Sequence, residues 1–334
     1  MRLLPYIFLP LFSLATLSTS CIGQTNNHAM MDTQKSNPLI CDPEEGICGV
    51  PANDPTPGKK QAAQEQSLKL VYFTDPICSS CWGIEPQLRK LKLEYGADIV
   101  IEYRMGGLLP DWSYNSGGIS KPSDVAHHWD EVSAHYDMPI DGDVWLEDPL
   151  SSSYPPSIAF KAAQLQDAEK AVLFMREMRE LVFLQKKNIA KWEHMATAAK
   201  TAGLDVVQLK KDYEGSAVAL FEADLELARK YGVRGFPTIF FSNAEGKQEM
   251  IYGAKPYPFY ETALLTLAPQ AVKKEYEKDW HSLFGKYSSL TAKEFAALSG
   301  TPRKDSEAVL DGLVNEGLLT KLNTKNGAMW RLKK

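Results

Sequence analysis

Two cysteines separated by two residues are the strongest sign of chemistry in this sequence. Cys78 and Cys81 lie in the stretch TDPICSSCWGIEP, after an apolar run and before a segment with helical periodicity. A pair with this spacing can form a redox-active disulfide, half of a zinc site or a structural cross-link. The elements around the pair decide among these chemistries.

The predicted position of Cys78 favours redox chemistry. The stretch LKLVYFTD (68–75) is rich in β-branched and aromatic residues and predicts a buried strand, whereas the apolar stripe from Trp82 onward predicts a helix. Cys78 therefore stands where a helix begins, and the free backbone N–H groups there stabilise a thiolate. We expect Cys78 to be the nucleophile and Cys81 to be the resolving thiol.

The elements farther along the chain predict an α/β fold with a helical block inside it. Residues 98–109 predict a second strand, which gives a βαβ unit with parallel pairing. Helical patterns fill residues 106–230, and residues 236–254 predict a β-hairpin that a last helix follows. Pro86 should kink the first helix, because the apolar periodicity continues past it.

This arrangement resembles the DsbA-like form of the thioredoxin superfamily, in which a helical domain interrupts the thioredoxin fold. DPICSSCW resembles the FrnE-type and SpxH/YjbH branch, and SYPPSIAFKAAQ (153–164) is similar to a helix of that branch. The resemblance covers residues 68 to about 270 and rests on the combination of C-x-x-C with a late RGFPT. It implies a thioredoxin-fold domain at 67–105 and 231–272, and a helical insertion at 106–230.

The resemblance also implies roles for the residues around Pro237. Pro237 should form a cis peptide bond and face the cysteines, and the backbone beside it should pair with a bound substrate chain. Pro237 is therefore assigned to the catalytic site, and Phe236, Thr238 and Trp82 are assigned to substrate binding.

The sequence departs from the family pattern at two places. Phe236 is bulkier than the small β-branched residue that often precedes the proline. Tyr72 occupies the position, six residues before the first cysteine, where many relatives place a buried carboxylate that accepts a proton from the resolving thiol. Asp75 could take over that proton-accepting role or could simply cap the loop.

The overall composition is that of an ordinary globular protein. Of the 334 residues, 44% are hydrophobic and 24% are charged, and the formal net charge is −5. No overall basic character points to nucleic acid or to an anionic membrane surface.

The first twenty residues have the order of an export signal. Residues 1–20 run from an arginine through an apolar stretch to small hydroxyl residues, and Pro5 argues against a retained membrane span. The segment resembles a bacterial lipoprotein signal with Cys21 as the lipidated residue, although Leu17 lies four rather than three residues before it. We therefore predict an exported protein of the periplasm or cell envelope, attached to the membrane through Cys21.

A second cysteine pair lies in a segment, 21–66, whose polar composition predicts flexibility. With Cys21 lipidated, the other four of the five cysteines form two local pairs. Cys41 and Cys48 predict either a structural disulfide or a second redox pair that exchanges with Cys78. A zinc site shared by both pairs fits poorly, because zinc sites favour spacers of two to four residues and six separate these two.

His127, Glu131 and His135 form the other cluster that could hold a metal. Their spacing of four places them on one helix face. A solvated helix face explains the same pattern more simply, so we predict no metal site.

Residues 283–334 differ in character from the rest of the chain. They predict helix, turn, helix and short hairpin, and they resemble a winged helix-turn-helix. DNA recognition needs a basic helix, but the predicted second helix, DSEAVLDGLVNEG, is acidic. We interpret the segment as a protein-interaction or packing module and predict no nucleic-acid partner.

These observations predict a protein thiol–disulfide oxidoreductase that acts on exported proteins containing cysteines, together with a redox partner that the sequence does not identify. No diffusible cofactor is implied, since the cysteines carry the electrons. The alternative comes from the resemblance, because the SpxH/YjbH branch includes adaptors that bind a client and deliver it to a protease. In such an adaptor the redox chemistry would be secondary.

The dipeptide between the cysteines predicts the redox potential. Ser79 and Ser80 donate only weakly to a thiolate, whereas a histidine or another positive group would stabilise it strongly. We expect the Cys78–Cys81 pair to be less oxidising than DsbA. Equilibration with glutathione buffers measures this potential, and a value near about −120 mV, that of DsbA, would contradict the prediction.

Overall fold

The computed structural model describes most of the chain after residue 67 and two short stretches before it. The described residues are 41–42, 47–49, 68–113 and 119–333. The predicted export signal and Cys21 lie outside them, so both stay predictions. Among the described residues, no helix is long and apolar enough to cross a bilayer.

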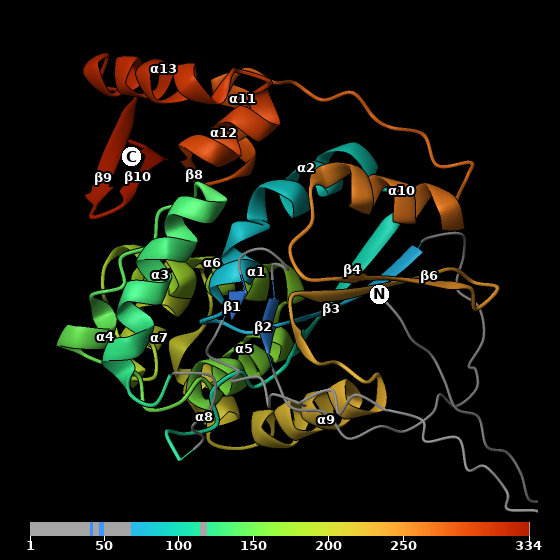
Figure 1. The fold of residues 1–334 in the computed structure, drawn as a ribbon, viewed down its shortest axis with the longest axis vertical. Helices are drawn as coiled ribbons and strands as arrows, with labels where there is room; N and C mark the ends of the chain where they lie inside the picture. The colour runs from blue at the N-terminus through green and yellow to red at the C-terminus, as the bar shows by residue number, and fades with distance from the viewer. Residues whose placement is uncertain (1–40, 43–46, 50–67, 114–118, 334) are drawn as a thin grey trace, which may run out of the picture. The chain divides into compact units, whose positions relative to one another are not determined.

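The main sheet has four strands in the order β4-β3-β6-β7 (Figure 1). β3 (Leu68–Thr74) pairs in parallel with β4 (Ile99–Met105) and antiparallel with β6 (Thr238–Ser242), which pairs in turn with β7 (Gln248–Tyr252). The predicted βαβ unit and hairpin are both confirmed. β3 is buried at every residue but Lys69, which explains its nearly continuous apolar sequence.

The helix after β3 is interrupted once. α1 (Ser79–Gly83) and α2 (Glu85–Tyr95) lie on either side of Ile84. Pro86 has no N–H group to donate to the carbonyl of Trp82, four residues earlier. The expected kink at Pro86 is therefore a break two residues before it, after which the apolar stripe continues and α2 packs against α10 (Tyr257–Leu267).

Seven helices follow β4 within the described residues and form the predicted helical block. They are α3 (Pro122–Tyr136), α4 (Val144–Glu147), α5 (Tyr154–Gln166), α6 (Ala168–Leu184), α7 (Trp192–Thr201), α8 (Val206–Tyr213) and α9 (Ala217–Lys230). The sequence did not indicate α4 or α8. α4 is a single turn, and α8 buries only Leu209, so neither has an apolar stripe long enough to detect.

A second, three-stranded sheet involves the segment that carries the other cysteine pair. β1 (Cys41–Asp42), β2 (Ile47–Gly49) and β5 (Gly235–Phe236) pair antiparallel in the order β1-β2-β5. The sequence predicts a flexible segment at 21–66 that carries both cysteines, and the structure assigns the two short strands β1 and β2 within it. β2 pairs with β5, which lies almost two hundred residues later in the sequence. The composition of the segment 21–66 carries no information about so distant a partner.

The C-terminal module has its own core. α11 (Trp280–Lys286), β8 (Ser289–Thr291), α12 (Ala292–Ser299), α13 (Arg303–Asn315), β9 (Leu319–Thr324) and β10 (Gly327–Leu332) follow one another, and the three strands form a sheet in the order β8-β10-β9. Trp330, Phe295 and Leu310 are among its buried residues. The predicted helices and hairpin are present, α11 and β8 were not anticipated, and the winged-helix identity stays a prediction.

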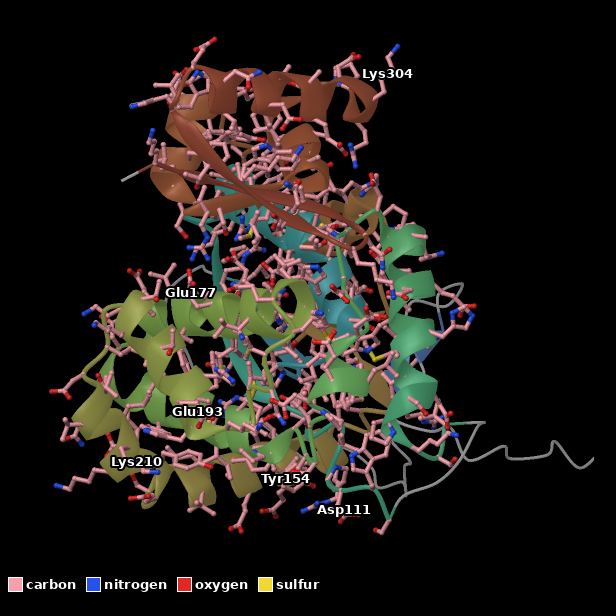
Figure 2. All side chains as sticks on the ribbon, turned by 90° about the vertical axis from the view of Figure 1, so that its left-hand side faces the viewer. Asp111, Tyr154, Glu177, Glu193, Lys210 and Lys304 are labelled. Carbon is pink, nitrogen blue, oxygen red and sulfur yellow. A yellow bond between two sulfur atoms is a disulfide. The ribbon has the colours of Figure 1, made fainter. Side chains whose placement is uncertain are left out.

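Buried ion pairs join this module to α6. Arg176 donates two hydrogen bonds to the carboxylate of Glu294, at 2.8 and 3.0 Å, and a third to Glu180 at 2.6 Å. Arg331 pairs with Glu177, which Figure 2 shows on the side of α6 toward the module, and also with Glu180. Burial alone would raise the pKa of Glu294, but Arg176 and Arg89 hold it below its ordinary value, so the carboxylate is ionised at neutral pH.

Arg176→Met should destabilise the protein by about 3 kcal/mol, because it leaves the carboxylates of Glu294 and Glu180 buried with fewer positive partners. Urea denaturation at pH 7 measures the loss. The matched control is Lys247→Met, which breaks an exposed pair with Glu245 and should change the free energy of unfolding by less than about 0.5 kcal/mol. A loss below about 1 kcal/mol for Arg176→Met would show that the cluster is not needed.

Candidate functional site

Cys78 and Cys81 are joined by a disulfide at the start of α1. Cys78 is the N-cap residue, and its Sγ accepts a hydrogen bond from the backbone N–H of Cys81 at 3.1 Å. Both cysteines are completely buried in this oxidised state. The predicted start of a helix at the cysteine pair is confirmed, and the two cysteines are close enough to form a disulfide.

The topology brings Pro237 to the end of β3 from which the cysteine loop leaves. The Phe236–Pro237 peptide bond is cis, as the resemblance implies. Thr238 lies opposite Phe73 in the pairing of β6 with β3, and β3 ends one residue later at Thr74. The catalytic role of Pro237 and the substrate contacts assigned to Phe236 and Thr238 stay predictions.

Phe236 and Thr238 are held firmly in place. The Oγ1 of Thr238 donates to the carbonyl of Gly235 at 2.7 Å. The ring of Phe236 lies against Gly106, where a Cβ atom would come within 1.8 Å of the Cζ of Phe236. A glycine after β4 is thus required by the bulky residue before the proline.

Trp82 lies in the core rather than at a binding surface. Its side chain is fully buried, its Nε1 donates to the carbonyl of Pro139 at 3.1 Å, and its ring stacks on Phe183. The guanidinium of Arg176 lies 4.3 Å from the ring centroid. The position does not support the predicted substrate contact, because core side chains already cover the ring. Trp82 instead anchors the start of the cysteine helix.

Asp75 caps the loop between β3 and the cysteines. Its carboxylate accepts hydrogen bonds from the backbone N–H groups of Ile77 and Leu108, at 3.0 and 2.8 Å, and from the Oγ of Ser153 at 2.8 Å. Burial raises the pKa of Asp75 to about 6 in spite of these donors. Asp75 therefore caps the loop, as one of the two alternatives predicted, and its role in proton transfer stays a prediction.

Tyr72, at the position where many relatives carry a carboxylate, cannot act as a base at neutral pH. It is fully buried in β3, and its ring lies 5.4 Å from that of Tyr103. Burial raises the pKa of its hydroxyl above the ordinary value, and the nearby Arg179 offsets only part of that effect. The phenol stays protonated.

Ser153 and Arg179 also support the site, although this role was not predicted from the sequence for either residue. The Oγ of Ser153 contacts Asp75, and it also accepts from the backbone N–H of Leu109 at 3.0 Å. Arg179 donates to Thr74 at 2.7 Å and to the Asp75 carbonyl at 3.3 Å. A charged residue on the apolar face of a predicted helix was the available signal for Arg179.

The remaining predictions about metals concern α3. His127 and Glu131 approach within 3.3 Å on an exposed face, but the described residues contain no cluster of three that could hold a metal ion. On the buried side of this helix, the hydroxyl of Tyr136 donates to the Oγ of Ser80 at 3.0 Å. α3 thus contacts one of the two serines between the cysteines.

Comparison with known proteins places this fold and site in a class. The family model described as Thioredoxin matches residues 72–262. The "putative protein disulfide isomerase" of Nitrosomonas europaea superposes with a TM-score of 0.51 at 20% identity, over 61% of this chain and 96% of that one, and so shares the fold. A helical block inside the thioredoxin fold and a C-x-x-C pair at a helix start define a DsbA-like member of the thioredoxin superfamily.

Two relatives narrow the class further. The ClpXP adapter protein SpxH of Halalkalibacterium halodurans is 33% identical over 88% of this chain and 97% of its own length. The protein of the same description from Bacillus subtilis is 28% identical over 80% and 90%. The chain therefore belongs to the SpxH branch of this superfamily.

The buried carboxylate of Asp75 makes stability depend on pH. Its pKa is higher in the folded protein than in the unfolded chain, so the folded state binds a proton more tightly, and this stabilisation is lost as the pH rises through about 6. Asp75→Asn removes the effect. The difference in unfolding free energy between wild type and Asp75→Asn should be about 2 kcal/mol larger at pH 4 than at pH 7.5.

Urea denaturation at the two pH values measures that difference. Ser153→Ala serves as the matched control, because it removes one hydrogen bond to the carboxylate but keeps the titrating group. Its stability should therefore retain the wild-type trend. A pH-independent difference between wild type and Asp75→Asn would contradict the raised pKa of Asp75.

Proposed function

We propose that this protein is a protein thiol–disulfide oxidoreductase that uses Cys78 and Cys81. The observation that carries the proposal is the disulfide at the start of α1, where the Sγ of Cys78 accepts the backbone N–H of Cys81. This hydrogen bond favours a thiolate at Cys78 over a thiol. Because α1 has only five residues, the local donor matters more than a long helix dipole.

The reaction follows from the two sulfurs. In the reduced protein the Cys78 thiolate attacks a sulfur of a substrate disulfide, forms a mixed disulfide and releases a substrate thiolate. The Cys81 thiol loses its proton, attacks the Sγ of Cys78 and releases the second substrate thiolate. Two electrons pass to the substrate, and the Cys78–Cys81 disulfide remains. The reverse sequence oxidises a substrate dithiol.

A second candidate function is client delivery to a protease. Relatives that align with more than four fifths of this chain are named as ClpXP adapters, and this likeness supports the candidate. Binding of this kind needs a surface rather than a reactive sulfur. An adapter would keep its partners when both cysteines are serine.

We also propose that the protein is exported and anchored through Cys21. The order of charged, apolar and small residues in 1–20 supports this proposal. Export places the cysteines in a compartment where disulfides persist, which suits an oxidoreductase. Protection of the protein from added protease in spheroplasts would contradict export.

Cys78→Ser should abolish the dithiothreitol-driven reduction of insulin, because serine is not a nucleophile toward disulfides at neutral pH. Turnover should fall to the buffer background. Cys21→Ser is the matched control and should keep the wild-type rate.

The same variants separate the two candidates. If Cys78→Ser/Cys81→Ser retains wild-type binding to purified ClpXP and the wild-type protein does not reduce insulin, client delivery replaces redox catalysis. If the wild type reduces insulin and does not bind ClpXP, the adapter candidate is excluded.

A further inference from the structure

The second cysteine pair lies beside the proposed redox site. β2 pairs antiparallel with β5, and the register places Cys48 opposite Phe236 and Gly49 opposite Gly235. Phe236 is the residue before Pro237. A strand edge with free N–H and C=O groups is a template for an extended chain, and here a segment of the same protein takes that position.

The same strand lies next to the cysteine helix (Figure 1). Residues of β2 and α1 approach within 8 Å, measured between Cα atoms, while β2 also pairs with β5. In the order β1-β2-β5, Cys48 lies on the strand that pairs with β5, and Cys41 lies one strand farther from β5.

The register of the first two strands also pairs the two cysteines. Cys41 lies opposite Cys48 in the antiparallel pair of β1 with β2. Residues that face each other in such a pair have Cα atoms about 4.5–5.5 Å apart, and a disulfide needs about 4.4–6.8 Å. The backbone therefore permits Cys41 and Cys48 to close a disulfide and, when reduced, to act as a dithiol.

We propose that Cys41 and Cys48 form a second redox pair that exchanges its disulfide with Cys78 and Cys81 while β2 stays paired with β5. The pair relays electrons between a redox partner and the Cys78–Cys81 site, and Cys78 still attacks the substrate. This inference deepens the proposed oxidoreductase function and rests on it. It also explains how two sulfurs with no exposed surface in the oxidised state take part in exchange.

The exchange balances without another reagent. The Cys48 thiolate attacks the Sγ of Cys78, a Cys48–Cys78 bond forms, and the Cys81 thiolate leaves and takes up a proton. The Cys41 thiolate then attacks the Sγ of Cys48 and releases the Cys78 thiolate. One disulfide has moved from Cys78–Cys81 to Cys41–Cys48, and two electrons have moved in the opposite direction.

Trapping the intermediate tests the order of attack. In the full chain carrying Cys21→Ser, the further change Cys41→Ser/Cys81→Ser leaves only Cys48 and Cys78. Mild oxidation should join them within one chain, because a partner in the same molecule has an effective concentration on the order of millimolar. Peptide mass mapping under non-reducing conditions identifies the bond.

The matched control exchanges the two N-terminal cysteines. Cys48→Ser/Cys81→Ser, again with Cys21→Ser, leaves Cys41 and Cys78 and should cross-link at least about tenfold more slowly, because Cys41 is one strand farther from β5. Equal rates for the two variants, or no Cys48–Cys78 bond, would overturn the proposal. Either result would mean that Cys41 and Cys48 form a structural disulfide or take no part in the exchange.

A turnover measurement checks the relay itself. Cys41→Ser/Cys48→Ser keeps Cys78 and Cys81 and should reduce insulin at least about tenfold more slowly than wild type, whereas unchanged turnover would exclude the relay. If wild type itself does not reduce insulin, the proposed function fails, but the cross-linking result still decides whether the two pairs exchange. The two failures are therefore distinguishable.

Discussion

The buried charge cluster around Arg176 constrains how the main parts of the described chain fit together. Arg176 lies on α6, pairs with Glu294 of the C-terminal module and stacks on Trp82 beside Cys81. A charge out of water is tolerated only while it is paired, so Arg176 and its carboxylate partners must meet wherever this interface is buried. Replacing such a cluster with apolar residues often costs little, and its main contribution is to specify one arrangement. The start of the cysteine helix is thereby coupled to a module far away in the sequence.

Asp75 is a second buried charged group whose hydrogen-bond partners come from several segments of the chain. One carboxylate collects donors from the cysteine loop, from the segment after β4 and from the start of α5. Its burial costs enough to raise its pKa to about 6, yet each donor is also a backbone or hydroxyl group that would otherwise be buried without a partner. The position of the cysteine loop therefore depends on residues in both the thioredoxin fold and the helical block.

The two candidate functions use these features differently. An oxidoreductase needs a route by which electrons reach a disulfide that is buried in its oxidised state, and β2 brings a second cysteine pair to that place. An adapter needs only a persistent surface, and the ion pairs between the C-terminal module and α6 would help to hold such a surface together. Relatives named as adapters and a cysteine pair able to form a disulfide are compatible within one family, because the fold fixes the scaffold and individual residues decide the activity.

The sequence by itself determined the local features of this protein: the strand–C-x-x-C–helix junction, the βαβ unit, the helical block and the hairpin after Pro237. Each follows from periodicity or from a short motif, both of which act over a few residues. Only the tertiary structure decided that Trp82 is a core residue, that the Asp75 carboxylate accepts a hydrogen bond from Ser153, and that Cys48 lies opposite Phe236. These outcomes depend on contacts between segments that are distant in the sequence, and no local pattern records such contacts.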